Sequence, residues 1–522
     1  MTYAEELATL LEGNAPFALL DVREHGEYNQ AHISGACPLP RRLIEYRLPK
    51  LVPHLATRIV VCDDDGARAA LALGTLSRMG YGNGSILEGG INRWTSLGYA
   101  SEWGINVPSK DFGERVQVER HIPEVTPEEL EGWISRGDNF VLVDSRTPEE
   151  HRSFCIPGSR SLPGGELALR VWDLMDAEDT PVVVHCAGRT RSIVGTSVLH
   201  RMGVKQVFGL RNGTMGWQLA GFDLEHGSGR VALDPPTPNA VARAEAFGRR
   251  VANEDGVNYL SPEGLRSLLS ERQDENVYLI DVRTRGEFEA GHVPGFWWHP
   301  GGQAVQETDN VVGVKAGQIV FCCDGLARAS VTASLYRQIG YPNVHVLEGG
   351  TTTWKAAGLE LESGPDNAVP ALLEEARARV PSLPPEDVAR MMESSMALFI
   401  GTSAEFAQGH PMGSQWAPRG SLELVVEHMV SSKSIPVALV SPEGRESLLA
   451  GLALLDMGYE NVASMEGGTR AWAAGGAPLE TGLAGVMTPP NDLVSTGSGR
   501  NFADAINYLR WEEELGHKYE KA

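Results

Sequence analysis

One sequence pattern occurs four times along the 522 residues of this chain, and this repetition constrains the fold more than any other feature. Each copy ends in a short glycine-containing segment that closes on a tryptophan. The four segments are LEGGINRW, LRNGTMGW, LEGGTTTW and MEGGTRAW, ending at Trp94, Trp217, Trp354 and Trp472. Successive tryptophans lie 123, 137 and 118 residues apart, which is the size of a domain and too long for a solenoid repeat. We therefore expect four domains of one kind, each with its tryptophan in the core.

Each copy also contains two apolar runs that are typical of buried strands. The first leads into a polar helix start in FALLDVREHGEY, FVLVDSRTPEEH, VYLIDVRTRGEF and MALFIGTSAEF. The second leads through a short polar loop into a helical pattern, as in RIVVCDDDGARAALALGTLSRMGY. Continuous Val/Ile runs that alternate with helices indicate a parallel sheet covered on both faces, and therefore an α/β fold. In such folds ligands bind in the loops after the carboxyl ends of the strands.

Equal spacings align these loops between the copies. Three copies carry an Asp-x-Arg motif, beginning at Asp21, Asp144 and Asp281, while the fourth has Gly401 in its place. We expect this motif to be structural, with the aspartate capping a helix and the arginine bridging to a neighbour. A loop arginine lies 47 residues after each aspartate and 26 before each tryptophan, at Arg68, Arg191 and Arg328, and the fourth copy has Glu446. Five residues before this position stand Asp63, Cys186, Cys323 and Ser441.

The loop of the second copy, HCAGRTRS at residues 185 to 192, combines a cysteine with small and basic residues just before a helix. Backbone N–H groups at a helix N-terminus bind anions and favour a thiolate over a thiol. Together with Arg189 and Arg191, they are expected to lower the pKa of Cys186 from about 8.5 toward or below neutrality. Such a site suits a small anionic sulfur compound.

The Asp-x-Arg strand ends, the segment GHVPG at residues 291 to 295, the Cys-x4-Arg-Ser loop and the terminal EGG-x3-W together resemble the rhodanese (thiosulfate sulfurtransferase) family. The resemblance covers nearly the whole chain as four tandem domains and implies a three-layer α/β/α fold for each. It also implies double displacement: the thiolate of Cys186 attacks the outer sulfur of a donor such as thiosulfate, and the persulfide passes to a thiol or cyanide. By the same resemblance, the substrate-binding residues of this loop are Ala187, Gly188, Arg189, Thr190 and Arg191.

Two departures from the family pattern lie in the second copy. Cys155 stands where the other copies have His32, His292 and His410, and the glutamate of EGG is replaced within LRNGTMGW. The family's thiosulfate- and mercaptopyruvate-preferring members carry loops unlike CAGRTR, so the resemblance does not determine the donor.

The other loops differ in their suitability for this chemistry. The first has three consecutive aspartates at residues 63 to 65, and like charges about 4 Å apart repel by roughly 1 to 4 kcal/mol. The fourth has Ser441 without an adjacent base, which is a poor nucleophile. The third keeps Cys323 and Arg328 but adds Asp324, so Cys323 is the second catalytic candidate, with Arg328 binding the substrate. His185, beside Cys186, is expected to be packed rather than catalytic.

A second register of the loop indicates a different enzyme class. Cys62 to Arg68 and Cys322 to Arg328 read Cys-x5-Arg, the spacing of the rhodanese-like dual-specificity phosphatases and arsenate reductases. A longer loop adds a residue between the fixed positions, whereas the intervals of 47 and 26 residues are unchanged. We therefore favour Cys323 and keep Cys322 as the nucleophile of the phosphatase alternative. In the sulfurtransferase interpretation, the buried apolar cysteines are Cys37, Cys62, Cys155 and Cys322.

Composition limits the partners. The formal net charge of −23 argues against nucleic acid or an anionic membrane. No run reaches the roughly 18 apolar residues of a membrane span, and the start MTYAEELATLLEGNAPF lacks the features of a secretory signal, so a cytoplasmic location is expected. Six cysteines without CxxC spacing predict neither a disulfide framework nor a zinc site, and no cofactor is expected.

These patterns predict four rhodanese-like domains and a final segment. Domain 1 is residues 1–108 and domain 4 is 380–482, both inactive; domain 2 is 120–228 and active; domain 3 is 250–365 with the second candidate site; 483–522 is a linker and an amphipathic helix. That helix packs on the body or on a second subunit, so a homo-oligomer is left open. The predicted function is a sulfurtransferase, and the alternative is a persulfide carrier or interaction scaffold that receives sulfur from a desulfurase.

Overall fold

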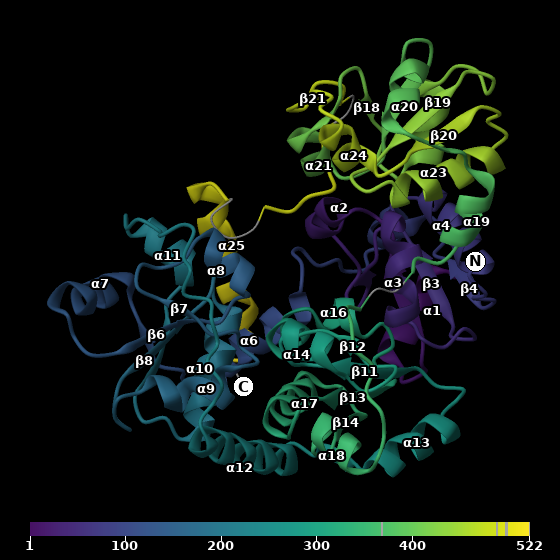
Figure 1. The fold of residues 1–522 in the computed structure, drawn as a ribbon. Helices are drawn as coiled ribbons and strands as arrows, with labels where there is room; N and C mark the ends of the chain where they lie inside the picture. The colour runs from purple at the N-terminus through teal and green to yellow at the C-terminus, as the bar shows by residue number, and fades with distance from the viewer. Residues whose placement is uncertain (367–368, 487–488, 496–499, 521–522) are drawn as a thin grey trace. The chain divides into compact units, whose positions relative to one another are not determined.

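The computed structural model describes residues 1–366, 369–486, 489–495 and 500–520. The chain divides into two compact units, whose elements are labelled in Figure 1. The first unit joins Met1–Ile105 to Asn367–Val494 and holds domains 1 and 4. The second joins Asn106–Asp366 to Ser495–Ala522 and holds domains 2 and 3. Two domains that are distant in the sequence therefore share the first unit, and the final segment of the chain returns to domains 2 and 3.

Each domain of the second unit contains a five-stranded parallel sheet. Domain 2 has the order β5-β9-β8-β6-β7, with β5 Glu124–Val125, β6 Val141–Asp144, β7 Arg160–Ser161, β8 Val182–His185 and β9 Val207–Leu210. Domain 3 repeats it as β10-β14-β13-β11-β12, with β10 Asn258–Leu260, β11 Val277–Asp281, β12 Trp297–Trp298, β13 Gln318–Cys322 and β14 Val344–Leu347. The strand before each candidate loop, β8 or β13, is central.

The first unit contains the same sheet twice with small variations. Domain 4 has the order β15-β20-β19-β16-β18, with β15 Ser382–Leu383, β16 Met396–Phe399, β18 Gln415–Trp416, β19 Val437–Val440 and β20 Val462–Met465. An antiparallel pair, β17 His410–Pro411 and β21 Leu479–Glu480, is added to it. Domain 1 has β2-β1-β3-β4, with β1 Ala18–Asp21, β2 Cys37–Pro38, β3 Ile59–Cys62 and β4 Gly84–Ile86. A single bridge between Thr2 and Leu87 stands where the other domains have a fifth strand.

Helices connect and cover the strands. Those of domain 1 are α1 Ala4–Glu12, α2 His25–Gln30, the 3-10 helix η1 Arg41–Leu43, α3 Ile44–Leu51, α4 Ala67–Arg78 and α5 Gly90–Ser96. Those of domain 2 are α7 Pro127–Arg136, α8 Pro148–Ser153, α9 Leu167–Arg170, the 3-10 helix η2 Val171–Leu174, α10 Thr190–Met202 and α11 Gly213–Leu219. Those of domain 3 are α13 Pro262–Glu271, α14 Arg285–Ala290, α15 Gly301–Gln306, α16 Thr308–Val311, α17 Ala327–Ile339 and α18 Gly350–Ala356. Those of domain 4 are α20 Pro385–Met392, α21 Ser403–Gln408, α22 Leu422–Met429, α23 Arg445–Asp456 and α24 Gly468–Ala474.

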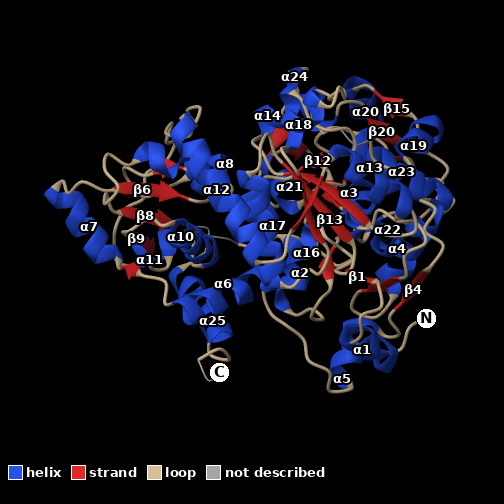
Figure 2. Cartoon of the chain, turned by 90° about the horizontal axis from the view of Figure 1, so that it is seen from below, coloured by secondary structure: helices blue, strands red, loops and turns tan. Residues whose placement is uncertain are grey.

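The cores show that each sheet is covered on both faces. Along β8, Val182 and Val184 belong to one apolar cluster and Val183 to another, because successive side chains of a strand point to opposite faces. Helices flank the strands within each domain in Figure 2. The predicted three-layer α/β/α fold with parallel sheets is confirmed.

Four further helices lie outside the repeats: α6 Val107–Arg120, α12 Pro238–Glu254, α19 Leu373–Arg379 and α25 Phe502–Gly516. The first three each precede a domain and pack on the helix that follows its candidate loop, α10, α17 or α23. Glycines allow two of these contacts: a Cβ on Gly113 of α6 would lie 3.1 Å from Thr190, and one on Gly248 of α12 would lie 3.2 Å from Ala327. The linker helices therefore hold the loops from outside the sheets.

The repeated tryptophans are buried, as predicted, with 2 to 8% of each residue exposed. Each indole N–H donates to the backbone carbonyl six residues later, from Trp94 to Ala100 and from Trp217 to Asp223 for example, at 2.8 and 2.9 Å. The tryptophan thus fixes the segment that leaves its helix.

The Asp-x-Arg motif is structural, but its aspartate does not cap the next helix. In domain 2, Thr147 caps α8 and forms a reciprocal capping box with Glu150. Asp144 instead binds the guanidinium of Arg146 at 2.7 Å, and Arg146 also donates to the carbonyl of Phe154 at the far end of α8. The prediction of an aspartate cap was wrong, because threonine accepts the first-turn N–H with a side chain already at the cap position.

Among the described residues, no helix is both long enough and apolar enough to span a membrane.

Candidate active site

The loop of domain 2 places Cys186 directly after β8 and four residues before the first residue of α10, Thr190. The cysteine is buried, with 2% of its surface exposed. Its thiol donates to the Oγ of Ser192 at 3.5 Å, and the backbone N–H of Ser192 also contacts the sulfur. From the other side of the loop, the N–H groups of Thr214 and Met215 in α11 donate to the carbonyls of Cys186 and Ala187 at 2.9 and 3.0 Å. The sulfur is therefore held at the N-terminus of α10.

Glycine is required where α11 meets this loop. Gly213 has a φ of +52°, and a Cβ there would lie 2.2 Å from the carbonyl oxygen of Cys186. The corresponding glycines of the other domains make the same approach to the residue at the cysteine position: Gly90 to Asp63, Gly350 to Cys323 and Gly468 to Ser441. The absence of a side chain at this glycine allows the helix to pack directly against the loop. The four loops therefore share one backbone arrangement at this contact.

Domain 1 shows what the amides of this loop bind. The carboxylate of Asp63, at the position of Cys186, accepts backbone N–H groups from Gly66, Arg68 and Ala69 at 2.5, 2.7 and 3.1 Å. Burial raises the pKa of Asp63, and these three N–H bonds act in the opposite direction. The same loop therefore converges its amides on a negatively charged group.

The loop arginine forms a fixed ion pair in three domains. Arg191 binds Glu150 through two hydrogen bonds of 2.7 and 2.8 Å. Arg68 binds Glu27 and Arg328 binds Glu287 in the same two-bond manner. Each glutamate is the third residue of the short helix after β1, β6 or β11, where it belongs to a capping box. Arg191 therefore closes the loop by tying it to α8, and it also reaches the side chain of Gln303 at 3.1 Å.

Arg189 binds carboxylates of other elements. Its guanidinium binds Glu114 of α6 at 2.7 and 2.9 Å and Glu513 of α25 at 3.2 Å. Arg189 and Arg191 were both predicted to bind substrate, and in this structure both are occupied by protein carboxylates.

The expected lowering of the pKa of Cys186 is wrong for this structure. Burial raises that pKa, while the charge of Arg191 and the hydrogen bonds with Ser192 offset the rise only in part. The sequence shows the two arginines but not the carboxylates that neutralise them. The raised pKa favours the thiol of Cys186 over the thiolate in the arrangement described here.

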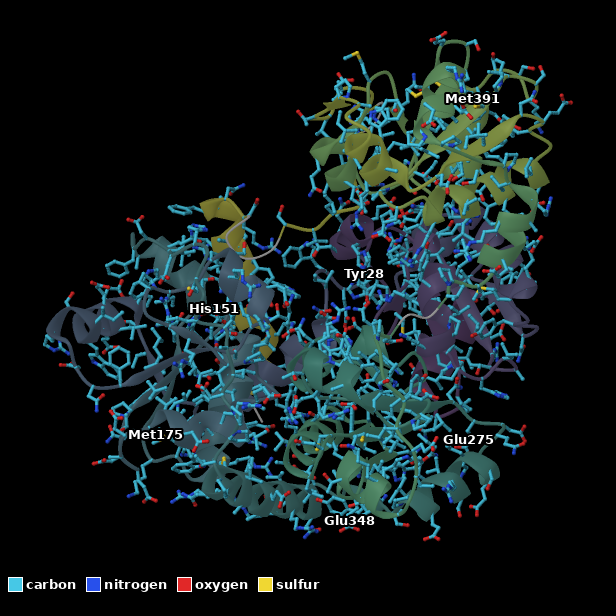
Figure 3. The ribbon with its side chains drawn as sticks, in the orientation of Figure 1. Tyr28, His151, Met175, Glu275, Glu348 and Met391 are labelled. Atoms are coloured by element: carbon cyan, nitrogen blue, oxygen red, sulfur yellow. The ribbon has the colours of Figure 1, made fainter. Side chains whose placement is uncertain are left out.

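His185 and Cys155 lie in a buried polar cluster below the loop. His185 is fully buried at the end of β8, and burial lowers its pKa to about 4, so it is neutral and packed. His151, labelled in Figure 3, binds Asp144 at 3.2 Å; burial opposes its charge, yet Asp144 and Cys155 raise its pKa to about 9. The other domains have a stacked ring pair here, such as Tyr28 and His32 with centroids 3.9 Å apart.

The second candidate, Cys323 of domain 3, is also buried, with 1% exposed. Burial raises its pKa to about 11, and Asp324 adds to the rise that Arg328 opposes. Arg328 is held by three carboxylates, Glu287, Asp324 and, from domain 2, Glu166, at 2.7 to 2.8 Å. Cys323 therefore has the same place in its loop as Cys186, but Asp324 adds a carboxylate within that loop.

Cys322 is the last residue of β13 and pairs in register with Asp281. Its side chain is fully buried within the apolar core, and burial raises its pKa well above the usual range. Cys62 has the equivalent place in β3, opposite Asp21. The Cys-x5-Arg register would thus require a nucleophile inside a strand.

Sequence reasoning missed the residues that cover the loop of domain 2. Glu512 and Tyr508 of α25 lie against Gly188, where a Cβ would be 3.2 Å from Oε2 of Glu512 and 3.6 Å from the ring of Tyr508. The helix itself was expected, but its partner was not, because nothing local to residues 502–516 indicates a loop more than 300 residues earlier.

Comparisons with known proteins agree with this geometry. The family model described as rhodanese-like domain matches residues 3–97, 126–220, 262–357 and 385–475. A crystal structure of a thiosulfate sulfurtransferase from Pseudomonas aeruginosa superposes with a TM-score of 0.91 and 34% identity, covering 99% of this chain and 98% of that chain. A sulfurtransferase from Allochromatium vinosum is 28% identical over 103 residues, which are 20% of this chain and 94% of that protein.

A further curated relative, the thiosulfate sulfurtransferase GlpE from Actinobacillus succinogenes, is 34% identical over 91 residues, covering 17% of this chain and 80% of that protein. The single-domain relatives thus match one repeat, and the Pseudomonas protein matches the whole chain. This chain belongs to the rhodanese family, as a sulfurtransferase with four tandem rhodanese-like domains.

Proposed function

We propose that this protein moves sulfane sulfur from a small anionic donor such as thiosulfate to a thiol or cyanide through a persulfide on Cys186. The observation that carries this proposal is the set of loop amides that bind the carboxylate of Asp63 in domain 1. In domain 2 the same position holds a thiol, so the same amides are available to a thiolate or persulfide anion.

The first half-reaction forms the persulfide. The thiolate of Cys186 attacks the outer sulfur of thiosulfate, a new S–S bond forms, and the S–S bond of thiosulfate breaks with its electron pair leaving on sulfite. The N–H of Ser192 and its neighbours at the start of α10 stabilise the negative charge, which moves from the cysteine sulfur to the outer sulfur.

The second half-reaction returns the thiolate. An acceptor thiolate, or cyanide, attacks the outer sulfur of the persulfide, and the electron pair of the broken S–S bond stays on Cys186. The products are an acceptor persulfide or thiocyanate. Arg191 has a positioning role, because its two bonds to Glu150 keep the loop closed around the sulfur.

Cys186 is preferred to Cys323 because its loop contains no carboxylate of its own. In domain 3, Asp324 directly follows the cysteine and raises its pKa further. We assign the main activity to domain 2 and keep domain 3 as the second candidate.

Mass spectrometry after exposure to thiosulfate tests the proposal. We expect Cys186 to gain one sulfur atom, and we expect Cys186→Ser to lower kcat/KM for thiocyanate formation by at least about a thousandfold, as loss of a nucleophile does. The matched control is Cys323→Ser, which should lower it by less than about twofold. Full activity of Cys186→Ser would refute the proposal, whereas loading of Cys186 only by a desulfurase would favour the carrier alternative.

The phosphatase alternative has its own test. It requires hydrolysis of an aryl phosphate that is lost in Cys322→Ser and survives in Cys323→Ser. The position of Cys322 inside β13 leads us to expect no such hydrolysis above the buffer rate.

A further inference from the structure

Helix α25 is anchored on both sides of the Cys186 loop. Its Ala505 and Leu509 pack with Met215 of α11, which holds the loop from one side. Its last turn meets α6, where Gly516 lies near Val118 and Glu114. The helix therefore lies across the loop of domain 2, with one flank on each element that supports it.

The side chains that α25 turns toward the loop are Tyr508 and Glu512, one helical turn apart. The hydroxyl of Tyr508 donates to Oε1 of Glu512 at 2.7 Å, and Thr190 of the loop donates to the same oxygen at 3.5 Å. Glu512 is 2% exposed, and its Oε2 has no hydrogen-bond partner among the residues that the structure describes. This oxygen faces Gly188, two residues after the cysteine.

The charges around the loop make Glu512 distinctive. The cations Arg189 and Arg191 are each bound to a glutamate, Glu114 and Glu150 respectively. Lys110 of α6 lies 4.8 Å from the ring centroid of Tyr508 and 5.0 Å from that of Trp511, and the charges of Lys110 and Glu512 attract each other, so Lys110 offsets part of the carboxylate charge. The other carboxylates nearby, Glu513 and Glu124, face Arg189. Glu512 thus presents a carboxylate oxygen toward a loop that is otherwise built to receive an anion.

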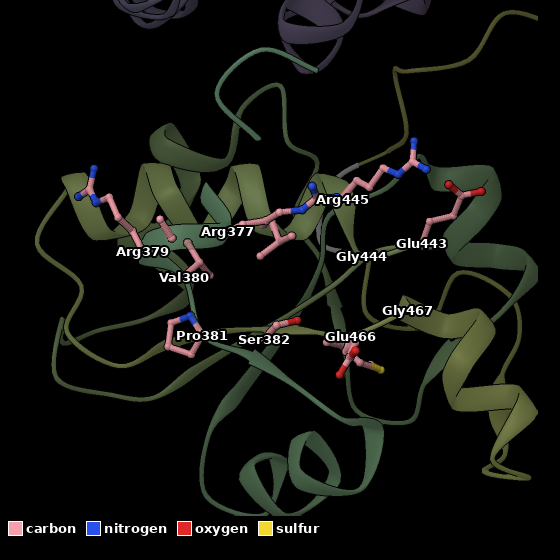
Figure 4. A pocket seen from close by; sticks show the side chains of 13 residues that line it. Arg377, Arg379, Val380, Pro381, Ser382, Glu443, Gly444, Arg445, Glu466 and Gly467 are labelled. Atoms are coloured by element: carbon pink, nitrogen blue, oxygen red, sulfur yellow. The ribbon is translucent and has the colours of Figure 1, made fainter. Parts of the chain in front are cut away.

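In domain 4 the same corner of the fold is open. A cavity of about 610 Å³ opens there, and its lining includes Glu443, Gly444 and Arg445 of the loop (Figure 4). These residues correspond to Gly188, Arg189 and Thr190 by their distance from the repeated tryptophan. The loop positions that line the cavity in domain 4 are therefore covered in domain 2, where Tyr508 and Glu512 lie against Gly188 and Glu513 binds Arg189.

We propose that α25 is a lid that determines donor specificity at Cys186, and that Glu512 selects sulfane sulfur donors carrying at most one negative charge. The inference rests on the function proposed for Cys186 and narrows its substrate class: thiosulfate, a dianion, still donates sulfur, but more slowly than an organic thiosulfonate or persulfide of similar shape that carries at most one negative charge. With a thiosulfonate, the thiolate attacks the outer sulfur, the S–S bond breaks, and the sulfinate leaves with the electron pair.

Two donors of similar shape test the charge selection. Methanethiosulfonate replaces one oxygen of thiosulfate by a methyl group and carries one negative charge less. We expect Glu512→Gln to raise the ratio of kcat/KM for thiosulfate to that for methanethiosulfonate about five- to tenfold, the effect of one charge at several ångströms in a partly screened site. The matched control is Glu514→Gln, which removes an exposed carboxylate from the same helix and should change the ratio by less than about twofold.

Alkylation of Cys186 tests the lid without requiring turnover. Peptide mass spectrometry gives the rates with iodoacetamide, which is neutral, and iodoacetate, which is anionic. Because both reagents meet the same thiolate, their ratio reports charge selection alone, and Glu512→Gln should raise the iodoacetate-to-iodoacetamide ratio severalfold. Leu509→Ala, which weakens the contact with Met215, should raise both rates at least about fivefold.

The outcomes separate this inference from the proposed function. Unchanged ratios in Glu512→Gln, or unchanged alkylation rates in Leu509→Ala, would overturn the lid even if Cys186→Ser abolishes sulfur transfer. Transfer that survives in Cys186→Ser would overturn the proposed function, whatever the alkylation rates are.

Discussion

Four residues occupy one position in four copies of the same loop, and their differences show what the loop recognises. Asp63 fills the amide site with its own carboxylate, and Ser441 accepts N–H groups from Gly444 and Ser447 at 3.1 and 3.3 Å. Cys186 and Cys323 place sulfur there. The four domains thus share the geometry of this loop and differ in the side chain that it holds, which determines the chemistry that each loop can perform.

Removal of the Asp63 carboxylate tests this view of the loop. Asp63→Ala leaves three N–H groups without their acceptor, two of them buried, and we expect the first unit to lose about 1 to 3 kcal/mol in its free energy of unfolding. Denaturant unfolding measures the loss. The control Asp65→Ala removes an exposed carboxylate of the same loop that accepts a single N–H, from Ala67 at 3.0 Å, and should cost less than about 1 kcal/mol. Equal losses in the two variants would contradict an anion site.

The sequence was sufficient to locate Cys186 but not to describe its state. The intervals of 47 and 26 residues identified the equivalent positions, because insertions fall outside the segment that joins strand, loop and helix. The raised pKa was missed because it depends on burial and on partners such as Glu114, which is 75 residues from Arg189 and in another element. Long-range pairing of this kind leaves no local pattern.

At the scale of elements, the linker helices do more than connect domains. α6, α12 and α19 each pack on the helix that begins at the loop of the following domain. The surface on which they pack leaves no local pattern in the sequence. Small residues determine this packing surface. Gly113 allows α6 to approach α10, and Gly248 allows α12 to approach α17, more closely than a side chain would permit.

A larger residue at this contact should separate α6 from α10. We expect Gly113→Leu to destabilise the second unit by about 1 to 3 kcal/mol, because its side chain must displace Thr190 at the start of α10. Thermal unfolding measures the change. Gly74→Leu in α4 is the matched control, since a Cβ there meets nothing within 4 Å, and it should be neutral within about 0.5 kcal/mol. A neutral Gly113→Leu would show that the contact does not position the loop.

At the scale of the molecule, the two units differ in what their loops retain. Five residues before the loop arginine or its replacement, the second unit holds Cys186 and Cys323, whereas the first holds Asp63 and Ser441. In domain 4 the loop arginine is replaced by Glu446, which faces Glu405 where the other domains have an arginine–glutamate pair. Domain 1 contributes Arg42 and Glu24 to the same region, so this carboxyl group lies where domains 1 and 4 meet.

This arrangement predicts a pH-dependent stability for the first unit. Burial and the charge of Glu405 raise the pKa of Glu446 from 4.5 to about 7. Because the pKa of Glu446 is higher in the folded than in the unfolded state, its protonated form stabilises the protein fully below about pH 4.5. This stabilisation is lost as the pH rises through about 7. We expect the free energy of unfolding to fall by roughly 2 kcal/mol between pH 5 and 8 from this group.

The variant Glu446→Gln should remove most of that fall, so that at pH 8 it unfolds at higher denaturant concentration than the unmodified protein. The control Glu466→Gln changes an exposed carboxylate of the same domain and should leave the pH dependence as it is. Parallel curves for Glu446→Gln and the unmodified chain would contradict the raised pKa.

The position of α25 in the chain also has a consequence in time. Translation runs from the N-terminus, so domain 2 leaves the ribosome before domains 3 and 4, and α25 follows them. The chain between Ala220 and Phe502 is roughly 280 residues, which takes about 15 to 60 seconds to synthesise at typical rates. If domain 2 folds as a unit during synthesis, as domains generally do, its Cys186 loop stays uncovered throughout that interval. In a newly made molecule the thiol of Cys186 is then accessible to any sulfur compound or oxidant nearby. The proposed donor selectivity is established only after α25 has been synthesised and has packed on the loop.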